Sequence, residues 1–214
     1  MSDNNMSTNT GKKKMGVRQL TVTAMLSAVA FVLMYIEFAI PIMPSFIKFD
    51  LSDLPALLGA FALGPVYGVL IELIKNLLHL VVSQSMFIGE LSNFILGATF
   101  VFTAGLIYNR NKCKKSAIIG GIVGAVVMGL VSVPSNYFVV YPVYVKAYFD
   151  GAQQVCIDMY SAISSGLLHL SEMKSLLQCL VVFNLPFTVV KGLISVLITM
   201  FIYKPLSPIL HGRN

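Results

Sequence analysis

The stretch that decides the fold is residues 66–82, Val-Tyr-Gly-Val-Leu-Ile-Glu-Leu-Ile-Lys-Asn-Leu-Leu-His-Leu-Val-Val. Its polar members, Glu72, Lys75, Asn76 and His79, stand at offsets i, i+3, i+4 and i+7, so one face of a helix carries all four. Ionisable groups inside a membrane-length helix are expensive and usually face protein or a water-filled cavity. The stretch therefore predicts a polyhelical membrane protein with a polar interior.

The composition of the whole chain agrees with this prediction. Of 214 residues, 57% are hydrophobic and only 11% are charged, whereas a soluble domain has about 25% charged residues. The apolar residues form long blocks, which indicate several transmembrane helices. We expect one six-helix membrane domain over residues 17–205, between a flexible cytoplasmic N-terminus (1–16) and a cytoplasmic tail (206–214).

The apolar blocks predict an all-α protein. The expected spans are 17–38, 51–63, 66–82, 90–108, 116–141 and 176–203. At about 1.5 Å per residue the second span is shorter than a hydrocarbon core of about 30 Å. Either the loop before it dips below the outer surface, or neighbouring helices shield it. Residues 150–165 are expected to form a short helix in the external connection between the fifth and sixth spans.

Basic residues predict the topology. They gather before the first span, between the fourth and fifth spans (110–115), and after the sixth. By the positive-inside rule all three clusters are cytoplasmic, which six spans and two cytoplasmic termini satisfy. The net charge of +6 is thus explained by topology, and we do not expect nucleic-acid binding in so apolar a chain.

Small residues recur every fourth position in the fifth expected span. Gly120 and Gly124 form one row, and Gly121, Ala125 and Gly129 form another. This spacing permits close contact between helices, and packing within the protein is its simplest interpretation.

The sixth expected span carries a second polar seam, Asn184, Thr188, Lys191 and Ser195. Lys191 lies near the middle of the helix, too deep for its ammonium to reach the interface easily. It needs an acceptor or must lose its proton. The seam indicates either a ligand contact at Lys191 or a structural pair with Glu72 or with backbone carbonyls.

Further candidate ligand contacts lie in the outer half of the membrane. Asn136 can donate and accept hydrogen bonds there. Tyr137, Tyr141 and Tyr144 suit an aromatic belt, and one of them could instead form part of a pocket wall. The loop before the second span adds Phe46 and Lys48. A pocket built from these residues would open to the exterior.

Several activities lack their motifs. The sequence contains no Gly-x-x-x-x-Gly-Lys-Ser/Thr loop, no His-Glu-x-x-His and no Gly-x-Ser-x-Gly. The three histidines, His79, His169 and His211, are too scattered to suggest a metal site. We therefore expect neither an enzyme nor an ATPase, and we expect Glu72 and Lys75 to pair with each other as a structural feature.

A composite pattern resembles one family. It comprises residues 49–65 (Phe-Asp-Leu-Ser-Asp-Leu-Pro-Ala-Leu-Leu-Gly-Ala-Phe-Ala-Leu-Gly-Pro), Glu72-x-x-Lys-Asn-x-x-His79, Gly-Glu-Leu-Ser-Asn-Phe at 89–94, Asn-Tyr-Phe at 136–138, and Pro-Phe-Thr-Val-Val-Lys-Gly at 186–192. The pattern is similar to that of the riboflavin-specific substrate-binding (S) components, the RibU family, of energy-coupling-factor (ECF) vitamin transporters. The resemblance covers residues 18–205.

The resemblance implies a six-helix subunit of a bacterial plasma membrane that captures riboflavin from outside. It implies that this subunit assembles with a separate transmembrane coupling subunit and two cytoplasmic ATPase subunits. Riboflavin would be the transported ligand, and no cofactor is expected. In this family an Ala-x-x-x-Ala face of the first helix docks on the coupling subunit, and Ala24 and Ala28 match it.

When the family's ligand-contact positions are transferred to this sequence and combined with the polar seams, the resemblance implies a set of riboflavin contacts. These are Phe46, Lys48, Asn136, Tyr141, Asn184, Thr188 and Lys191. Family members often have asparagine where Thr188 stands, and Asn184, one turn outward, can replace that contact. Asn136 and Lys191 suit the polar edge of the flavin ring, and Phe46 or a tyrosine can cover its face.

Three alternatives remain at this point. The chain is an S component for another vitamin or a flavin precursor, an intramembrane enzyme using Glu72, His79 and Glu90, or a structural scaffold. The enzyme is disfavoured because these residues lie at different levels and no second carboxylate or histidine obviously pairs with His79. The polar seam around Lys191 argues against the scaffold.

Overall fold

The computed structural model describes residues 16–83, 87–166 and 172–211, and it is almost entirely helical. The helices are α1 (Val17–Tyr35), α2 (Asp53–Ala62), α3 (Pro65–His79), α4 (Ile88–Arg110), α5 (Lys114–Ser135), α6 (Tyr141–Tyr148), α7 (Gln153–Gly166), α8 (Leu176–Cys179) and α9 (Leu185–His211). A 3-10 turn, η1 (Leu80–Val82), extends α3. The predicted flexible segment 1–16 lies, except for Gly16, outside the described residues.

Within the described residues, five helical segments are long and apolar enough to cross a membrane: 17–35, 65–82, 88–110, 114–148 and 176–203. The remaining apolar helix, α2, has 10 residues. All of it except its last residue is buried, and it contacts α1, α3, α4 and α9. Neighbouring helices therefore shield this short helix, which is one of the two alternatives that the sequence left open.

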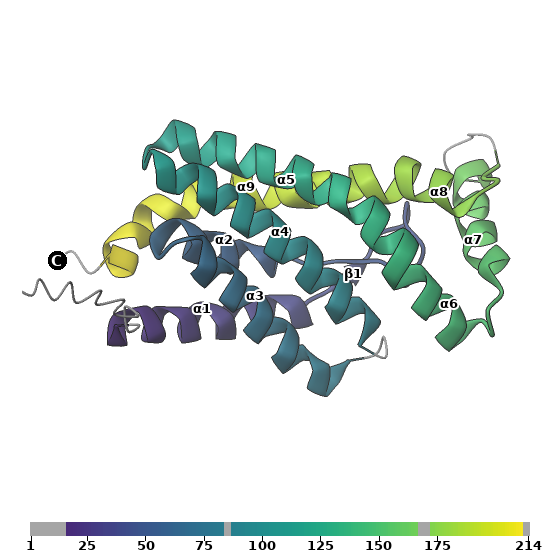
Figure 1. The fold of residues 1–214 in the computed structure, drawn as a ribbon, viewed down its shortest axis with the longest axis horizontal. Coiled ribbons are helices and arrows are strands. Elements are labelled where there is room, and N and C mark those ends of the chain that lie inside the picture. The colour runs from purple at the N-terminus through teal and green to yellow at the C-terminus, as the bar shows by residue number, and fades with distance from the viewer. Residues whose placement is uncertain (1–15, 84–86, 167–171, 212–214) are drawn as a thin grey trace, which may run out of the picture.

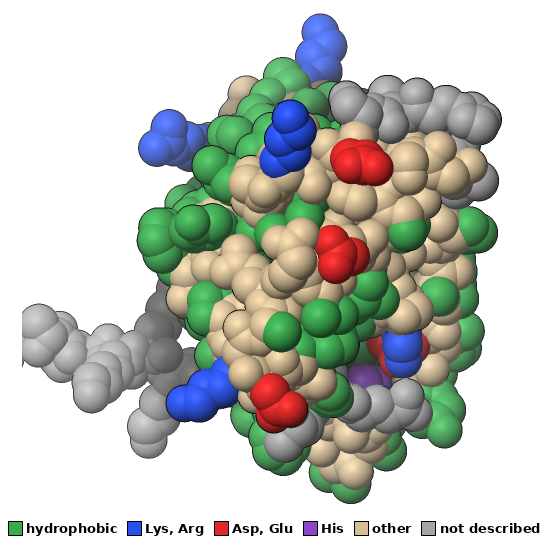
Figure 2. All heavy atoms as spheres, turned by 90° about the vertical axis from the view of Figure 1, so that its right-hand side faces the viewer, with side chains coloured by type: hydrophobic (Ala, Val, Ile, Leu, Met, Phe, Trp, Pro, Cys, Tyr) green, Lys and Arg blue, Asp and Glu red, His purple; other side chains and the backbone are tan. Residues whose placement is uncertain are grey.

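The helices form an elongated bundle in which α5 and α9 run side by side (Figure 1). The start of α1, the α4–α5 connection and the end of α9 lie at one end of the bundle. The helices α6, α7 and α8, here called the cap, lie at the opposite end. Seen from the cap, the described surface shows a few acidic and basic side chains scattered among hydrophobic side chains and other atoms (Figure 2).

The two rows of small residues in α5 face different neighbours. A Cβ atom on Gly124 would come within 2.8 Å of the Phe100 backbone oxygen in α4. A Cβ atom on Gly121 would come within 2.6 Å of Val196 Cγ2 in α9. The rows therefore let α4 and α9 approach α5 from two sides, which confirms the predicted close packing.

Two elements differ from the expected spans. The fifth span does not end at residue 141, because a π-helical turn, η2 (Asn136–Val140), joins α5 to α6 and continues the helix to Tyr148. A second π turn, η3 (Leu180–Asn184), joins α8 to α9, and α9 continues past residue 203 to His211. The expected external helix is present as α7.

The loop between α1 and α2 contains a short antiparallel ribbon that the sequence analysis did not predict. Strand β1 (Phe38–Ala39) pairs with β2 (Lys48–Phe49), with Phe38 opposite Phe49. The two rings contact each other, with centroids 5.3 Å apart. Phe49 also meets Phe187 of α9, with ring centroids 6.3 Å apart, which connects this loop, residues 37–50, to the bundle.

Candidate functional site

A cavity of about 420 Å³ lies between the ribbon loop, the start of α4, the η2–α6 segment and α9. This volume falls within the range of about 300–1,000 Å³ that small-molecule pockets occupy. Seven residues that the sequence predicted as ligand contacts line it: Phe46, Lys48, Asn136, Tyr141, Asn184, Thr188 and Lys191. The structure thus brings together residues from three separate parts of the sequence, 46–48, 136–141 and 184–191.

The ribbon loop supplies an aromatic wall and a charged group. The Phe46 ring packs on Tyr144, with centroids 4.8 Å apart, and meets Tyr141 edge-on at 5.9 Å. Lys48 forms an ion pair with Glu37 on the same loop. Tyr141 and Tyr144 therefore belong to the cavity wall, whereas Tyr137 is exposed.

The two π turns place an asparagine each at the cavity. Asn136 begins η2 and Asn184 ends η3, and both residues are buried. Asn136 Oδ1 accepts a hydrogen bond of 3.3 Å from Ser92 Oγ. A π turn inserts one residue into a helix and is frequent at functional sites. Helical periodicity alone does not predict such an insertion.

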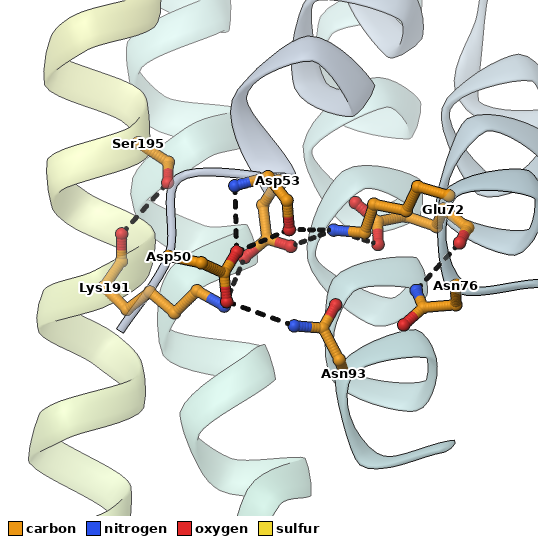
Figure 3. A network of polar contacts seen from close by, with 9 residues as sticks. Asp50, Asp53, Glu72, Asn76, Asn93, Lys191 and Ser195 are labelled. Atoms are coloured by element: carbon orange, nitrogen blue, oxygen red, sulfur yellow. Dashed lines mark hydrogen bonds and ion pairs between the residues drawn. The ribbon is translucent and has the colours of Figure 1, made fainter. Parts of the chain in front are cut away.

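Lys191 has carboxylate partners, but Glu72 is not among the contacts that position it. Its Nζ lies 3.0 Å from Asp50 Oδ2 and 3.3 Å from Asp53 Oδ2. The expected alternative of a pair with Glu72 is therefore wrong. Figure 3 shows why: Asp50 and Asp53 stand between Lys191 and Glu72.

The carboxylate of Asp53 joins the two polar seams into one network (Figure 3). Lys75 Nζ lies 2.7 Å from Asp53 Oδ1, 2.8 Å from Glu72 Oε2 and 2.7 Å from Ser52 Oγ. The predicted pairing of Glu72 with Lys75 is present, and Asp53 and Lys75 are almost completely buried. Since each ion has an opposite charge in contact, the network offsets the cost of burying these groups in a membrane protein.

Asp50 holds the loop end of this network. Its Oδ1 accepts hydrogen bonds from Ser52 N at 2.9 Å and from Ser52 Oγ at 2.5 Å. Asn93 Nδ2 of α4 donates to Asp50 Oδ2 at 3.4 Å. The sequence pattern did not predict this role of Asp50. The signal for its role was the spacing of Asp50 and Asp53 before a helix too short to span the membrane.

His79 pairs with Glu90 across the ends of α3 and α4, with Nδ1 2.9 Å from Oε1. Both residues line the cavity. The expectation that His79 and Glu90 lie at different levels is therefore wrong. Among the described residues, no three His, Cys, Asp or Glu side chains are placed to hold a metal ion.

Comparison with known proteins identifies the family of this chain. Residues 18–203 match the family described as "ECF transporter, substrate-specific component". The chain belongs to this family. It is therefore an S component and a multi-pass membrane protein, and the polar network and cavity lie inside its helical bundle.

Relatives of this S component have been named as transporters. It is 33% identical over 201 residues to riboflavin transporter RibU of Staphylococcus aureus (strain TCH60), covering 92% of this chain and 96% of that protein. It is 29% identical to riboflavin transporter FmnP of Bacillus subtilis (strain 168), covering 91% and 94%. It is 32% identical to riboflavin transporter RibU of Streptococcus thermophilus (strain ATCC BAA-250 / LMG 18311), covering 90% and 84%.

A solved structure agrees with the S component at the level of the fold. The structure described as "Structure and mechanism of the S component of a bacterial ECF transporter" superposes with a TM-score of 0.69. The two chains are 33% identical, and the match covers 90% of this chain and 97% of the other.

The two alanines that the resemblance predicted as a docking face lie away from the cavity. Ala24 and Ala28 are exposed on α1, as are their neighbours Met25 and Val29. Thr23, Ser27 and Ala30 face the bundle instead. The small residues therefore form part of an apolar outer surface of this S component.

Proposed function

We propose that this S component binds riboflavin from outside a bacterial cell and delivers it for ATP-driven uptake by a separate coupling module. The observation that carries the proposal is that all seven expected contact residues line one cavity. The identity of the ligand is inferred from the names of the relatives, which are riboflavin transporters of several bacteria.

The chemistry of the cavity suits a flat aromatic ligand with polar edges. Phe46, Tyr144 and Phe187 offer aromatic surface, which suits the faces of an isoalloxazine ring. Asn136 and Lys191 offer donors for its carbonyl and nitrogen edge. Thr188 offers a hydroxyl for the ribityl chain. A mostly apolar pocket with a few placed polar groups is the usual form of a small-molecule site.

The topology that we propose has six spans, with α2 as a short one, and both termini in the cytoplasm. In support, the basic cluster at residues 110–115 lies in the α4–α5 connection, at the same end of the bundle as the start of α1. The cap then faces outward, and the cavity beside it is open to external riboflavin.

One measurement tests the ligand directly. Purified protein should show the visible absorbance of a flavin or should bind added riboflavin in a titration. Competition with FMN, lumichrome and thiamine then ranks the alternatives of another flavin or another vitamin. Protein that neither carries nor binds riboflavin contradicts the proposal.

Two variants test the site. A hydrogen bond to a charged donor contributes about 1.5–3 kcal/mol, so Lys191→Met should weaken riboflavin binding by about 10- to 150-fold. Asn136→Ala should weaken it by about 3- to 10-fold, as expected for neutral hydrogen bonds. The control is Lys146→Met, because Lys146 is exposed on α6 and does not line the cavity. Unchanged affinity in either site variant removes that residue from the site.

The partner surface that we propose is the exposed face of α1 with Ala24 and Ala28. Ala28→Trp would place a large ring where two helices must approach closely. This variant should bind riboflavin as the parent does but lose energy-dependent uptake in cells that contain the coupling module. Normal uptake by Ala28→Trp would show that this face does not contact the partner.

A further inference from the structure

Tyr160 of α7 is a polar residue that is buried within the cap and does not line the cavity. It has 0% relative exposure and is among the largest fully buried side chains of the described chain. Its ring packs on Phe183, with centroids 5.2 Å apart. A phenol so completely buried needs a hydrogen-bond partner.

Tyr160 has two such partners, and both of them line the cavity. Its hydroxyl donates to Asn184 Oδ1 at 2.5 Å, and the Tyr141 hydroxyl lies 2.6 Å from it. Asn184 and Tyr141 belong to the cavity lining. Tyr160 therefore connects the surface helix α7 with two polar groups of the site.

The number of protons fixes the direction of this chain. Each phenol has one proton to donate. Because Tyr160 gives its proton to Asn184, the proton between the two tyrosines must come from Tyr141. Burial raises the pKa of the Tyr160 phenol well above its ordinary value, so the donor stays protonated. The order is Tyr141, then Tyr160, then Asn184 Oδ1.

This order determines what each group presents to a ligand. With Oδ1 of Asn184 occupied by Tyr160, the Nδ2 group is left to donate into the cavity. With its own proton given to Tyr160, the Tyr141 oxygen is left to accept. Without Tyr160, the amide of Asn184 could present either of its two ends, since they have the same shape.

We propose that Tyr160 is a positioning residue that sets Asn184 as a donor and Tyr141 as an acceptor in the ligand site. The ligand group that fits this pair has an acceptor, such as a carbonyl or ring nitrogen, close to a donor, such as N–H or hydroxyl. This inference rests on the proposed riboflavin site, and it gives α7 of the cap a role in recognition.

The test is a double-mutant cycle on riboflavin affinity. Tyr160→Phe keeps the ring and removes the hydroxyl, and it should weaken binding by about 5- to 10-fold, the size of one hydrogen bond. In a background that carries both Asn184→Leu and Tyr141→Phe, which removes both groups that Tyr160 positions, the same change should weaken binding less than about twofold. An equal loss in both backgrounds, or no loss in either, overturns the proposal. Tyr137→Phe, at an exposed tyrosine away from the cavity, is the control.

A second variant keeps the test independent of Tyr160→Phe. Asn184→Asp retains an oxygen for Tyr160 but replaces the Nδ2 donor by an acceptor, and it should weaken binding at least 10-fold. Binding by this variant as tight as that of the parent overturns the proposal, because a donor at Nδ2 is then not used.

A ligand-free measurement separates this inference from the proposed function. In protein labelled with ¹⁵N-asparagine, Tyr160→Phe should shift the side-chain amide signal of Asn184, assigned by its absence in Asn184→Leu. A shifted signal in protein that fails to bind riboflavin supports the positioning and refutes only the ligand. An unchanged signal in protein that binds riboflavin refutes only the positioning.

Discussion

Replacing Asp53 by asparagine should destabilise the protein even without ligand. Asp53 is the only carboxylate of the described network that contacts both lysines, with Lys75 Nζ 2.7 Å from Oδ1 and Lys191 Nζ 3.3 Å from Oδ2. Asn has the same shape but no charge, and its Nδ2 donor would face an ammonium group. The change therefore leaves two buried cations with one fewer carboxylate.

The size of the effect follows from what each lysine retains. Removing one partner of a buried ion pair costs about 3–5 kcal/mol. Lys75 keeps Glu72 at 2.8 Å and Lys191 keeps Asp50 at 3.0 Å, so we expect the lower end, about 3 kcal/mol. For a chain of this length each kcal/mol lowers the melting temperature by about 2–4 °C, which gives about 6–12 °C.

Melting followed by circular dichroism at 222 nm in detergent, without riboflavin, measures this change. The matched control is Asp158→Asn, because Asp158 is exposed on α7 and accepts a hydrogen bond from Gln154 Nε2 on the same helix. The control should melt within about 2 °C of the parent, as surface substitutions usually do. If Asp53→Asn also melts within 2 °C, the ion pairs do not hold the two seams together and the reasoning fails.

Two further substitutions test the packing around the same helices. Gly97→Ala should lower the free energy of unfolding by about 1–3 kcal/mol, because the added Cβ would lie 2.3 Å from Glu72 Oε2. Its control, Gly166→Ala, should be nearly neutral in the same melting assay, because a Cβ there meets no described atom within 4 Å. His79→Ala should cost about 1–3 kcal/mol by leaving the buried Glu90 carboxylate without its imidazole partner, and an unchanged melting temperature would show that this pair contributes nothing.

Much of the site could be predicted from the sequence because polar residues in apolar helices are few and follow the helical period. The spacing of Asn184, Thr188 and Lys191 placed them on one face, and the structure puts that face on the cavity. The partner of Lys191 could not be found in this way. Asp50 lies 141 residues away along the chain, and periodicity gives the direction of a side chain but not what lies opposite.

The same distinction holds for local geometry. Periodicity assumes about 3.6 residues per turn, so it does not predict the π turns that carry Asn136 and Asn184. Nor did composition, which predicted α7 as a surface helix, indicate that Tyr160 would hydrogen-bond to two residues of the cavity wall.

The sequence by itself determined that this protein is a multi-helix membrane protein, which of its helix faces are polar, and which family it resembles. These properties depend on hydropathy, charge placement and residue order, all of which are local or cumulative along the chain. Only the tertiary structure decided that Asp53 lies between Lys75 and Lys191, that His79 meets Glu90, and that the cap reaches the cavity through Tyr160. The physical reason is that a buried charge or hydroxyl is stabilised by whichever partner packing brings within hydrogen-bond distance.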